Sequence, residues 1–215
     1  MYGNAYFWLF FSLNGDLTPA RKTVLTNWKM KCNKYILRCA QCITDKMLVV
    51  KDSMVLIHLA KTTLLETSCT HFGQADIPAQ VFRETVEVGK AKNHPDAIVI
   101  QGTISKGMVN VVVVKNTELL QKAHEFNIQG GEAEAVALYW QEKAELLATD
   151  DDNVRGKKEL LDLNLIGTPA IILKLFKDKK IDAKKAKQSA EKLRKIGWFS
   201  SEVIDRIIME VENDG

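Results

Sequence analysis

From Met47 onward, apolar residues alternate between two patterns. Short apolar runs occur at LVVKD (48–52), MVNVVVV (108–114), LLAT (146–149) and LNLIG (163–167). Runs of this length, two of them dense in β-branched residues, are typical of buried strands. After the first run, SMVLIHLAKTTLLETSC carries its apolar residues at helical spacing. Strands that alternate with helices predict βαβ units, and therefore a parallel sheet with helices on both faces.

Local signals place the remaining helices. Glycine marks a turn at residue 73, and Pro78 lies near the start of the next helix, where its fixed φ is favourable. Pro169 predicts the first turn of another helix. Further helices are expected around 116–125, over 130–146 behind a glycine pair, and twice after Asp182, the last with Ser200 as a candidate N-cap. The segment from Asp96 fits a helix or a strand.

The first 46 residues differ from the rest of the chain. They hold three of the four cysteines and show no clean periodicity. Cys39 and Cys42 form a lone CxxC, which falls short of the four ligands of a closed zinc site. The apolar segment 5–13 is too short to span a bilayer, which needs about 20 residues. Our hypothesis is that 1–46 is an extension of unknown role upstream of the true start at Met47. We expect 47–215 to be the folded domain of a cytoplasmic protein that inserts into no membrane.

The 215 residues are 46% hydrophobic and 27% charged, which is ordinary globular composition, and the net charge of +3 says little about partners. The basic residues gather instead in the run 174–195, which holds ten Lys or Arg. One interpretation is a solvated helical face. The other is a surface for a polyanion, with these lysines as candidate nucleic-acid contacts: Lys174, Lys177, Lys179, Lys180, Lys184 and Lys185.

Acidic residues follow two of the predicted strands. Asp52 ends the first strand, and Asp150 and Asp151 follow LLAT. Sites in parallel sheets form outside the carboxyl ends of the strands, so these carboxylates are expected to meet if the two strands are neighbours. Glu84, within a helix, and Glu132, at the start of one, are candidates to join them. Bare anions at one place repel, and a divalent cation such as Mg²⁺ or Mn²⁺ removes that penalty.

Each acid also has a purely structural interpretation. Asp52 can serve as an N-cap of the helix that starts at Ser53, and Glu132 fits the preference of acids for a first helical turn. The run 150–152 fits a solvated turn. The residues alone leave the catalytic and the structural interpretations open.

Six blocks, in order, resemble the PIN-domain family: MLVVKDSMVLIHLAK, DIPAQVFRETVEVG, GGEAEAVALYW, LLATDDDNVR, LNLIGTPAIIL and KLRKIGWFSSEVIDRII. The similarity runs from Met47 to about Val211 and is strongest to short prokaryotic PIN proteins related to VapC-type toxins. It implies a three-layer α/β/α sandwich with a central parallel sheet and a metal-dependent ribonuclease site.

The resemblance also implies roles for single residues. Asp52, Glu84, Glu132 and Asp151 stand at the family's acidic positions, with Asp150 beside the last as a further metal ligand. The third position is glutamate where many of the toxins have aspartate. Two residues are expected to support the acids or meet a ligand, namely Ser53 and Arg155. Glu134 and Asp152 are expected to lie outside the metal's ligands or in solvent.

The function that the resemblance implies is a Mg²⁺- or Mn²⁺-dependent endoribonuclease, and the toxin of a toxin–antitoxin pair is one form that it takes. Its expected partners are RNA, an inhibitory antitoxin protein and a second copy of the chain in a homodimer. A non-catalytic module that binds nucleic acid or a partner is an alternative. A metal-dependent phosphatase or a DNA nuclease is a third, built on the same carboxylate chemistry.

Overall fold

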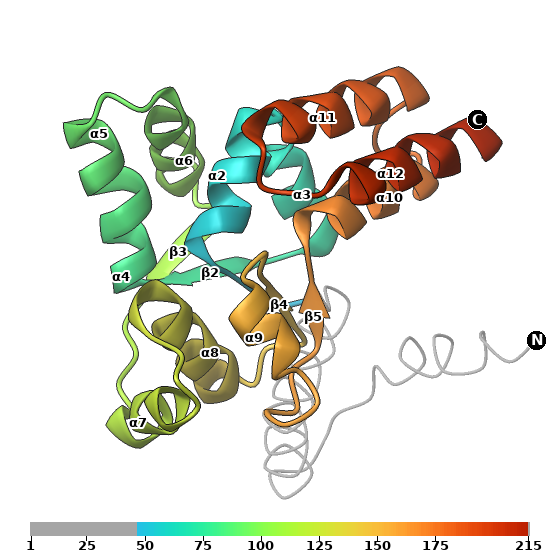
Figure 1. Cartoon of the computed structure of the whole chain (residues 1–215). Coiled ribbons are helices and arrows are strands. Elements are labelled where there is room, and N and C mark those ends of the chain that lie inside the picture. The colour runs from blue at the N-terminus through green and yellow to red at the C-terminus, as the bar shows by residue number, and fades with distance from the viewer. Residues whose placement is uncertain (1–46, 215) are drawn as a thin grey trace, which may run out of the picture. The chain divides into compact units, whose positions relative to one another are not determined.

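The structure, a computed structural model, describes residues 47–214. Five parallel strands form one sheet in the order β3-β2-β1-β4-β5 (Figure 1). The strands are β1 (Val49–Lys51), β2 (Ala75–Pro78), β3 (Val109–Val112), β4 (Leu146–Ala148) and β5 (Leu165–Ile166). β1 lies in the middle and pairs with β4 up to the partners Lys51 and Ala148. The carboxyl ends of β1 and β4 are therefore neighbours, which is the condition for the acids that follow them to meet.

Successive residues of the central strands are buried in opposite layers. Val49, Leu146 and Ala148 pack in one apolar cluster, and Val50 and Leu147 pack in the other. This is the period of two expected of a strand whose faces are both covered. It explains why LVV and LLA read as uninterrupted apolar runs in the sequence. The expected three-layer α/β/α sandwich is confirmed.

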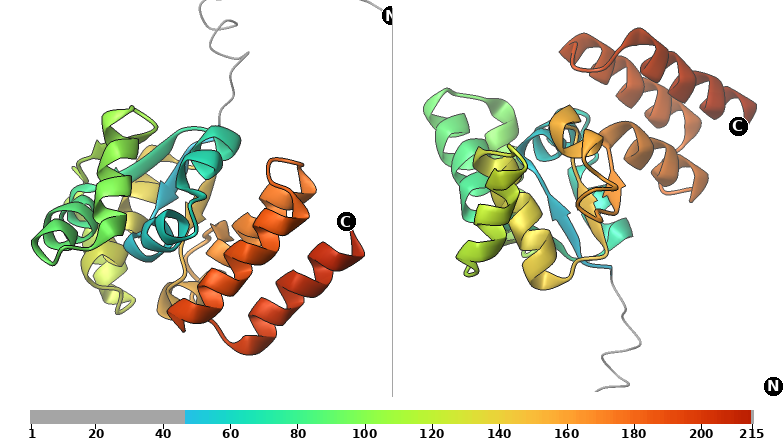
Figure 2. Two further views of the ribbon diagram at one scale, coloured as in Figure 1. Left: turned by 90° about the horizontal axis from the view of Figure 1, so that it is seen from above. Right: turned by 60° about the horizontal axis from the view of Figure 1, so that its bottom comes forward.

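The larger layer contains α2 (Ser53–Lys61), α3 (Leu65–Phe72), α6 (Pro95–Ser105), α10 (Thr168–Lys177), α11 (Ala183–Ile196) and α12 (Ser201–Asn213). The other layer contains α7 (Thr117–Glu125), α8 (Gly130–Glu142) and the short α9 (Asp152–Gly156). Between β2 and α6, the consecutive turns α4 (Ala79–Phe82), η1 (Arg83–Val88) and α5 (Gly89–Ala91) follow one another without a break. Figure 2 shows α11 and α12 side by side at the edge of the larger layer.

The structure corrects several expected boundaries. β2 was not predicted, because its four residues ADIP include a charge and a proline; Pro78 ends this strand, and α4 begins at Ala79. β5 has two residues rather than five. The segment after Asp96 is helical, as part of α6. α8 ends at Glu142, since Lys143 adopts a left-handed conformation and stops the helix.

Among the described residues, no helix is both long and apolar enough to cross a membrane. Residues 1–46 lie outside the described residues, so the hypotheses about the CxxC and about a start at Met47 stay predictions.

Candidate functional site

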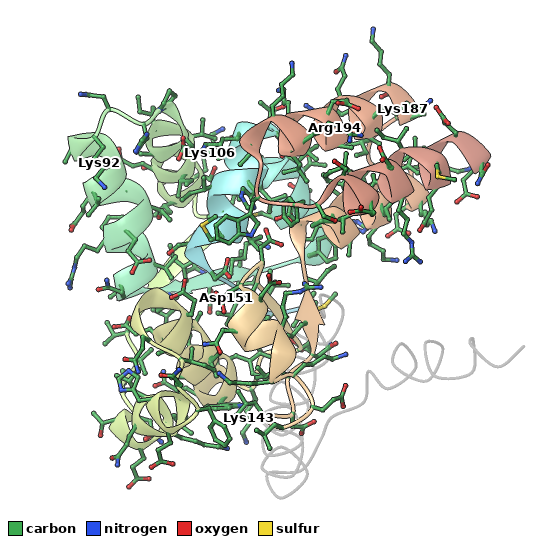
Figure 3. All side chains as sticks on the ribbon, in the orientation of Figure 1. Lys92, Lys106, Lys143, Asp151, Lys187 and Arg194 are labelled. Atoms are coloured by element: carbon green, nitrogen blue, oxygen red, sulfur yellow. The ribbon has the colours of Figure 1, made fainter. Side chains whose placement is uncertain are left out.

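Four predicted acids gather beyond the carboxyl ends of β1 and β4. Asp52 directly follows β1, and Asp151 precedes α9 after β4. Glu84 comes from η1 and Glu132 from the first turn of α8. The carboxylates of Glu84 and Asp151 lie close enough to Glu132 to raise its pKa. Glu132 in turn raises the pKa of Asp52, so the four acids lie around one region. Figure 3 shows Asp151 where α9 begins, facing the end of the sheet.

Asp52 is both a helix cap and a candidate ligand. Its Oδ1 accepts a hydrogen bond from the Val55 amide at 2.8 Å, which caps α2. Its Oδ2 is buried and has no hydrogen-bond partner among the described residues. Burial raises the pKa of Asp52 to about 7, and the Asp150 and Glu132 carboxylates add to the rise, while Thr149 and the Val55 amide oppose it. Oδ1 thus has the structural role of a helix cap, and Oδ2 stays a candidate oxygen for a metal ion.

Glu84 is held by hydrogen bonds on both oxygens. The Ser53 hydroxyl donates to Oε2 at 2.5 Å, and the Gln80 side-chain amide donates to Oε1 at 2.9 Å. The helix widens to π geometry over Arg83–Val88, a local distortion that is frequent at functional sites. The expected supporting role of Ser53 therefore takes a specific form, because its hydroxyl fixes the carboxylate of Glu84.

Two glycines bring the start of α8 against that carboxylate. A Cβ at Gly131 would lie 2.6 Å from Glu84 Oε2, which is closer than such contacts occur. Gly130 has a φ of +59°, a left-handed conformation that glycine adopts without strain. The positive end of a helix dipole favours a carboxylate at this place. The glycine pair therefore lets Glu84 approach the N-terminus of α8, where Glu132 also lies.

Glu132 and Asp151 complete the group of four. Glu132 is half-buried, and this burial raises its pKa, with the Glu84 and Asp151 carboxylates adding to the rise. Asp151 uses one oxygen, Oδ1, to cap α9 through the Val154 amide at 2.8 Å. Asp151 thus repeats the arrangement of Asp52, in which a capping bond fixes the side chain and leaves the second oxygen for another partner.

Asp150 lies in a different environment from the other acids. Its Oδ1 accepts from the Thr168 amide at 2.7 Å, and its Oδ2 accepts from the Thr168 hydroxyl and contacts His58 Nδ1 at 2.8 Å. All three residues are buried. Both oxygens are thus committed to joining β4, α2 and α10. Asp150 thus has a structural role in the core, and its predicted role as a further metal ligand stays a prediction.

Three charged residues that the sequence placed near the acids lie outside the group of four. Arg155 is exposed on α9, and its Nη1 donates to the Thr149 carbonyl at 3.4 Å. Asp152 is exposed, as expected. Glu134 is partly buried and accepts from the Gln80 amide at 3.0 Å, at the start of α4, where Pro78 offers no side-chain cap. Glu134 therefore links α8 to α4 and stays outside the group of four acids.

Part of the basic segment 174–195 is engaged by neighbouring residues of the larger layer. Lys174 pairs with Asp178 at 2.9 Å, and Lys177 pairs with Glu210 of α12 at 3.0 Å. Lys185 donates to the Thr62 carbonyl at the end of α2. Three of the six candidate lysines thus have structural partners. The other three form no ion pair with any described residue, and they are Lys179, Lys180 and Lys184.

The acids fit a cation, although their present positions are not those of a finished coordination sphere. Within residues 47–214, no three His, Cys, Asp or Glu side chains are grouped so that they could hold a metal ion as they lie. The chemistry of the donors nevertheless fits a hard cation, because Asp52 Oδ2 is buried without a hydrogen-bond partner among the described residues and further carboxylates lie around it.

Sequence reasoning missed three residues that shape this region. Gln80 stands four residues before Glu84, so its position on the same helical face was a usable signal. His58 and Thr168 contact Asp150 from helices that are remote in sequence, with 92 residues between His58 and Asp150. No local pattern marks such a contact.

Comparison with known proteins gives one match. A family model described as a PIN domain matches residues 48–213. Neither the curated proteins nor the solved structures gave a match. PIN domains are generally nucleases and typically use divalent metals. The match covers nearly all of the described residues, and it agrees with the parallel five-stranded sheet and with the acids at the carboxyl end of that sheet. The chain belongs to the PIN-domain family.

Proposed function

We propose that the protein is an endoribonuclease that hydrolyses RNA phosphodiesters with Mg²⁺ or Mn²⁺. The observation that carries the proposal is the buried Oδ2 of Asp52, which has no hydrogen-bond partner in the described part of the chain and is surrounded by further acids. Asp52, Glu84, Glu132 and Asp151 would hold the ion. When bound, a divalent cation neutralises these carboxylates and the substrate phosphate, and it lowers the pKa of a water.

The protein groups have separate parts in this proposal. Ser53 and Gln80 orient the carboxylate of Glu84, and the Val55 and Val154 amides orient those of Asp52 and Asp151. Glu132 is half-buried in the first turn of α8, where burial and the Glu84 and Asp151 carboxylates raise its pKa. We assign to its carboxylate the role of general base, which takes the proton of the water that attacks phosphorus in line. The bond from phosphorus to the 3′ or to the 5′ oxygen breaks, and that oxygen takes a proton from solvent.

The basic segment and the partners belong to the same proposal. Lys179, Lys180 and Lys184 remain candidates for phosphate contacts, because no ion pair within the described residues engages them. The resemblance to toxin nucleases is the sole support for an inhibitory antitoxin partner and for a homodimer. Mass measurement of the purified chain in solution tests the homodimer, and co-expression with neighbouring genes tests the antitoxin.

The test is cleavage of labelled RNA and DNA panels by the full chain with Mg²⁺, Mn²⁺ or EDTA. Glu132→Gln should lose metal-dependent RNA cleavage, whereas Glu142→Gln, an exposed change at the other end of α8, should keep it. Cleavage of DNA alone would replace RNA with DNA as the substrate. A folded wild-type chain that cleaves neither would leave the non-catalytic binding module as the better reading.

A further inference from the structure

A pocket opens beside the acidic group, between α9, α10 and the loop that joins α11 to α12. Its volume is about 340 Å³. It is lined by Asp150, Asp152, Arg155, Gly167, Trp198 and Phe199, among others. Small-molecule pockets begin at about 300 Å³, so a single nucleotide unit is of suitable size. Asp151, one of the four acids, lies between two of the lining residues in the chain.

Trp198 is an exposed aromatic ring whose orientation is fixed. The residue is 51% exposed, whereas most large apolar side chains of the domain are buried. Its indole N–H donates to the Asp150 carbonyl at 3.3 Å. The rings of Trp198 and Phe199 lie 6.2 Å and 5.2 Å from that of His58. The ring is thus tied to the buried Asp150 network, and it offers an aromatic surface to the pocket at little cost in conformational entropy.

The polar groups of the pocket suit a nucleotide. Arg155 offers an exposed guanidinium, the group best matched to a phosphate. Asp152 offers an exposed carboxylate, which can accept from the amino group of a base. Gly167 leaves the wall open, since a Cβ there would lie 2.7 Å from Arg155 Nη1. Phosphate, base edge and base face each meet a suitable partner.

We propose that this pocket binds one unpaired nucleobase of a single-stranded nucleic acid, stacked on Trp198, beside the phosphodiester that is cleaved. Arg155 contacts the phosphate next to that base. A base inside a duplex is already stacked and cannot enter, so the pocket selects single strands. The inference rests on the proposed nuclease function, and it specifies the substrate class of that site.

The first experiment measures binding of short labelled oligonucleotides to the full chain in EDTA, where metal-dependent cleavage is absent. Trp198→Ala should weaken binding of single-stranded RNA by roughly 5- to 100-fold, and Trp198→Phe by less, because a phenyl ring still stacks. Trp140→Phe is the matched control, since Trp140 contacts Lys122 and the Leu161 carbonyl elsewhere in the fold. Circular dichroism confirms that each variant folds.

A second experiment removes one base at a time from the oligonucleotide. One abasic position should weaken binding to the wild type but not to Trp198→Ala, because the missing base and the missing ring belong to one contact. Equal losses in both proteins, unchanged affinity of Trp198→Ala, or equal binding of duplex would each overturn the proposal. Parallel DNA oligonucleotides show whether the sugar matters; equal binding of DNA fits a pocket that reads only the base.

The two proposals fail separately. If Trp198 controls binding but Mn²⁺ supports no cleavage, the base pocket stands and the nuclease function falls. If Mn²⁺ supports cleavage and Trp198→Ala changes neither KM nor binding, the nuclease function stands and the base pocket falls. A wild-type chain that binds no single-stranded oligonucleotide also overturns the base pocket.

Discussion

Asp52→Asn should make the metal-free protein more stable at neutral pH, even though it removes a proposed ligand. Asparagine keeps an oxygen that can accept from the Val55 amide and cap α2. It removes the cost of a buried charge. The pKa of Asp52 rises from 3.8 to about 7, and each unit corresponds to about 1.36 kcal/mol. The gain has an upper bound of about 4 kcal/mol, or roughly 8–16 °C in Tm for a domain of this size.

The pH dependence fixes the sign of this effect. Because the pKa of Asp52 is higher in the folded state than in the unfolded state, the folded state binds more protons between about pH 4 and about pH 7. Wild-type stability therefore falls as pH rises through this window. The asparagine variant lacks this contribution. The two proteins should be similar near pH 4 and diverge toward pH 7, with the variant the more stable.

Urea denaturation of the full chain in EDTA across this pH range measures the difference. Adding Mn²⁺ should narrow the difference, because a ligand present at about 100 times its Kd stabilises by about 2.7 kcal/mol, and the variant would bind the ion less well. Asp152→Asn, an exposed change in the same aspartate run, controls for the loss of one charge. A variant that is no more stable than the wild type at pH 7, with the same pH slope, would refute the reasoning.

Three other changes have definite expected outcomes. Gly131→Ala should abolish most cleavage and lower stability by about 1–3 kcal/mol, because its Cβ would displace the Glu84 carboxylate; kinetics and Tm check this. Lys51→Met should raise Tm at neutral pH, because burial lowers the pKa of this lysine, and the gain should shrink as pH rises toward 10.5. Lys180→Ala should reduce the salt dependence of RNA binding, whereas Lys177→Ala, whose charge is paired with Glu210, should mainly lower Tm; equal salt slopes for both would contradict this.

The sequence was sufficient to predict the three layers of the fold and the position of three aspartates directly after two of the strands. The central strands were clear in the sequence because both of their faces are buried, so Val49 and Val50 of β1 and all three residues of β4 are apolar; the buried Lys51 is the exception. β2 was not predicted from the sequence, because its pairing with β1 and β3 outweighs the poor strand propensity of an aspartate and a proline. Its Asp76 is buried, and Asn110 of the adjacent strand donates to it at 2.9 Å. Such a cross-strand partner is invisible to local patterns.

The same limit explains the basic segment. The run 174–195 showed its charge but not its partners, because the acids that pair with it lie mainly in α12. Arg194 meets Asp205 at 2.6 Å and Lys187 meets Glu212 at 2.9 Å. Charge density along the chain therefore overstated the surface that is available to a polyanion. Exposed pairs of this kind contribute little stability, about 0–1 kcal/mol each, but they still remove lysines from competition for phosphate.

The three consecutive aspartates after β4 are tolerated because the fold gives each a different environment. Asp150 turns inward, where Thr168 and His58 satisfy both oxygens and tie three elements together. Asp151 caps α9 and keeps one oxygen for the acidic group. Asp152 stands in solvent at the rim of the Trp198 pocket. Since the carbonyl of Asp150 also holds the Trp198 indole, the run connects the core, the proposed metal site and the proposed base pocket within three residues. Asp150→Asn should therefore disturb RNA binding as well as stability, because the Asp150 side chain holds the elements on which both proposed sites are built.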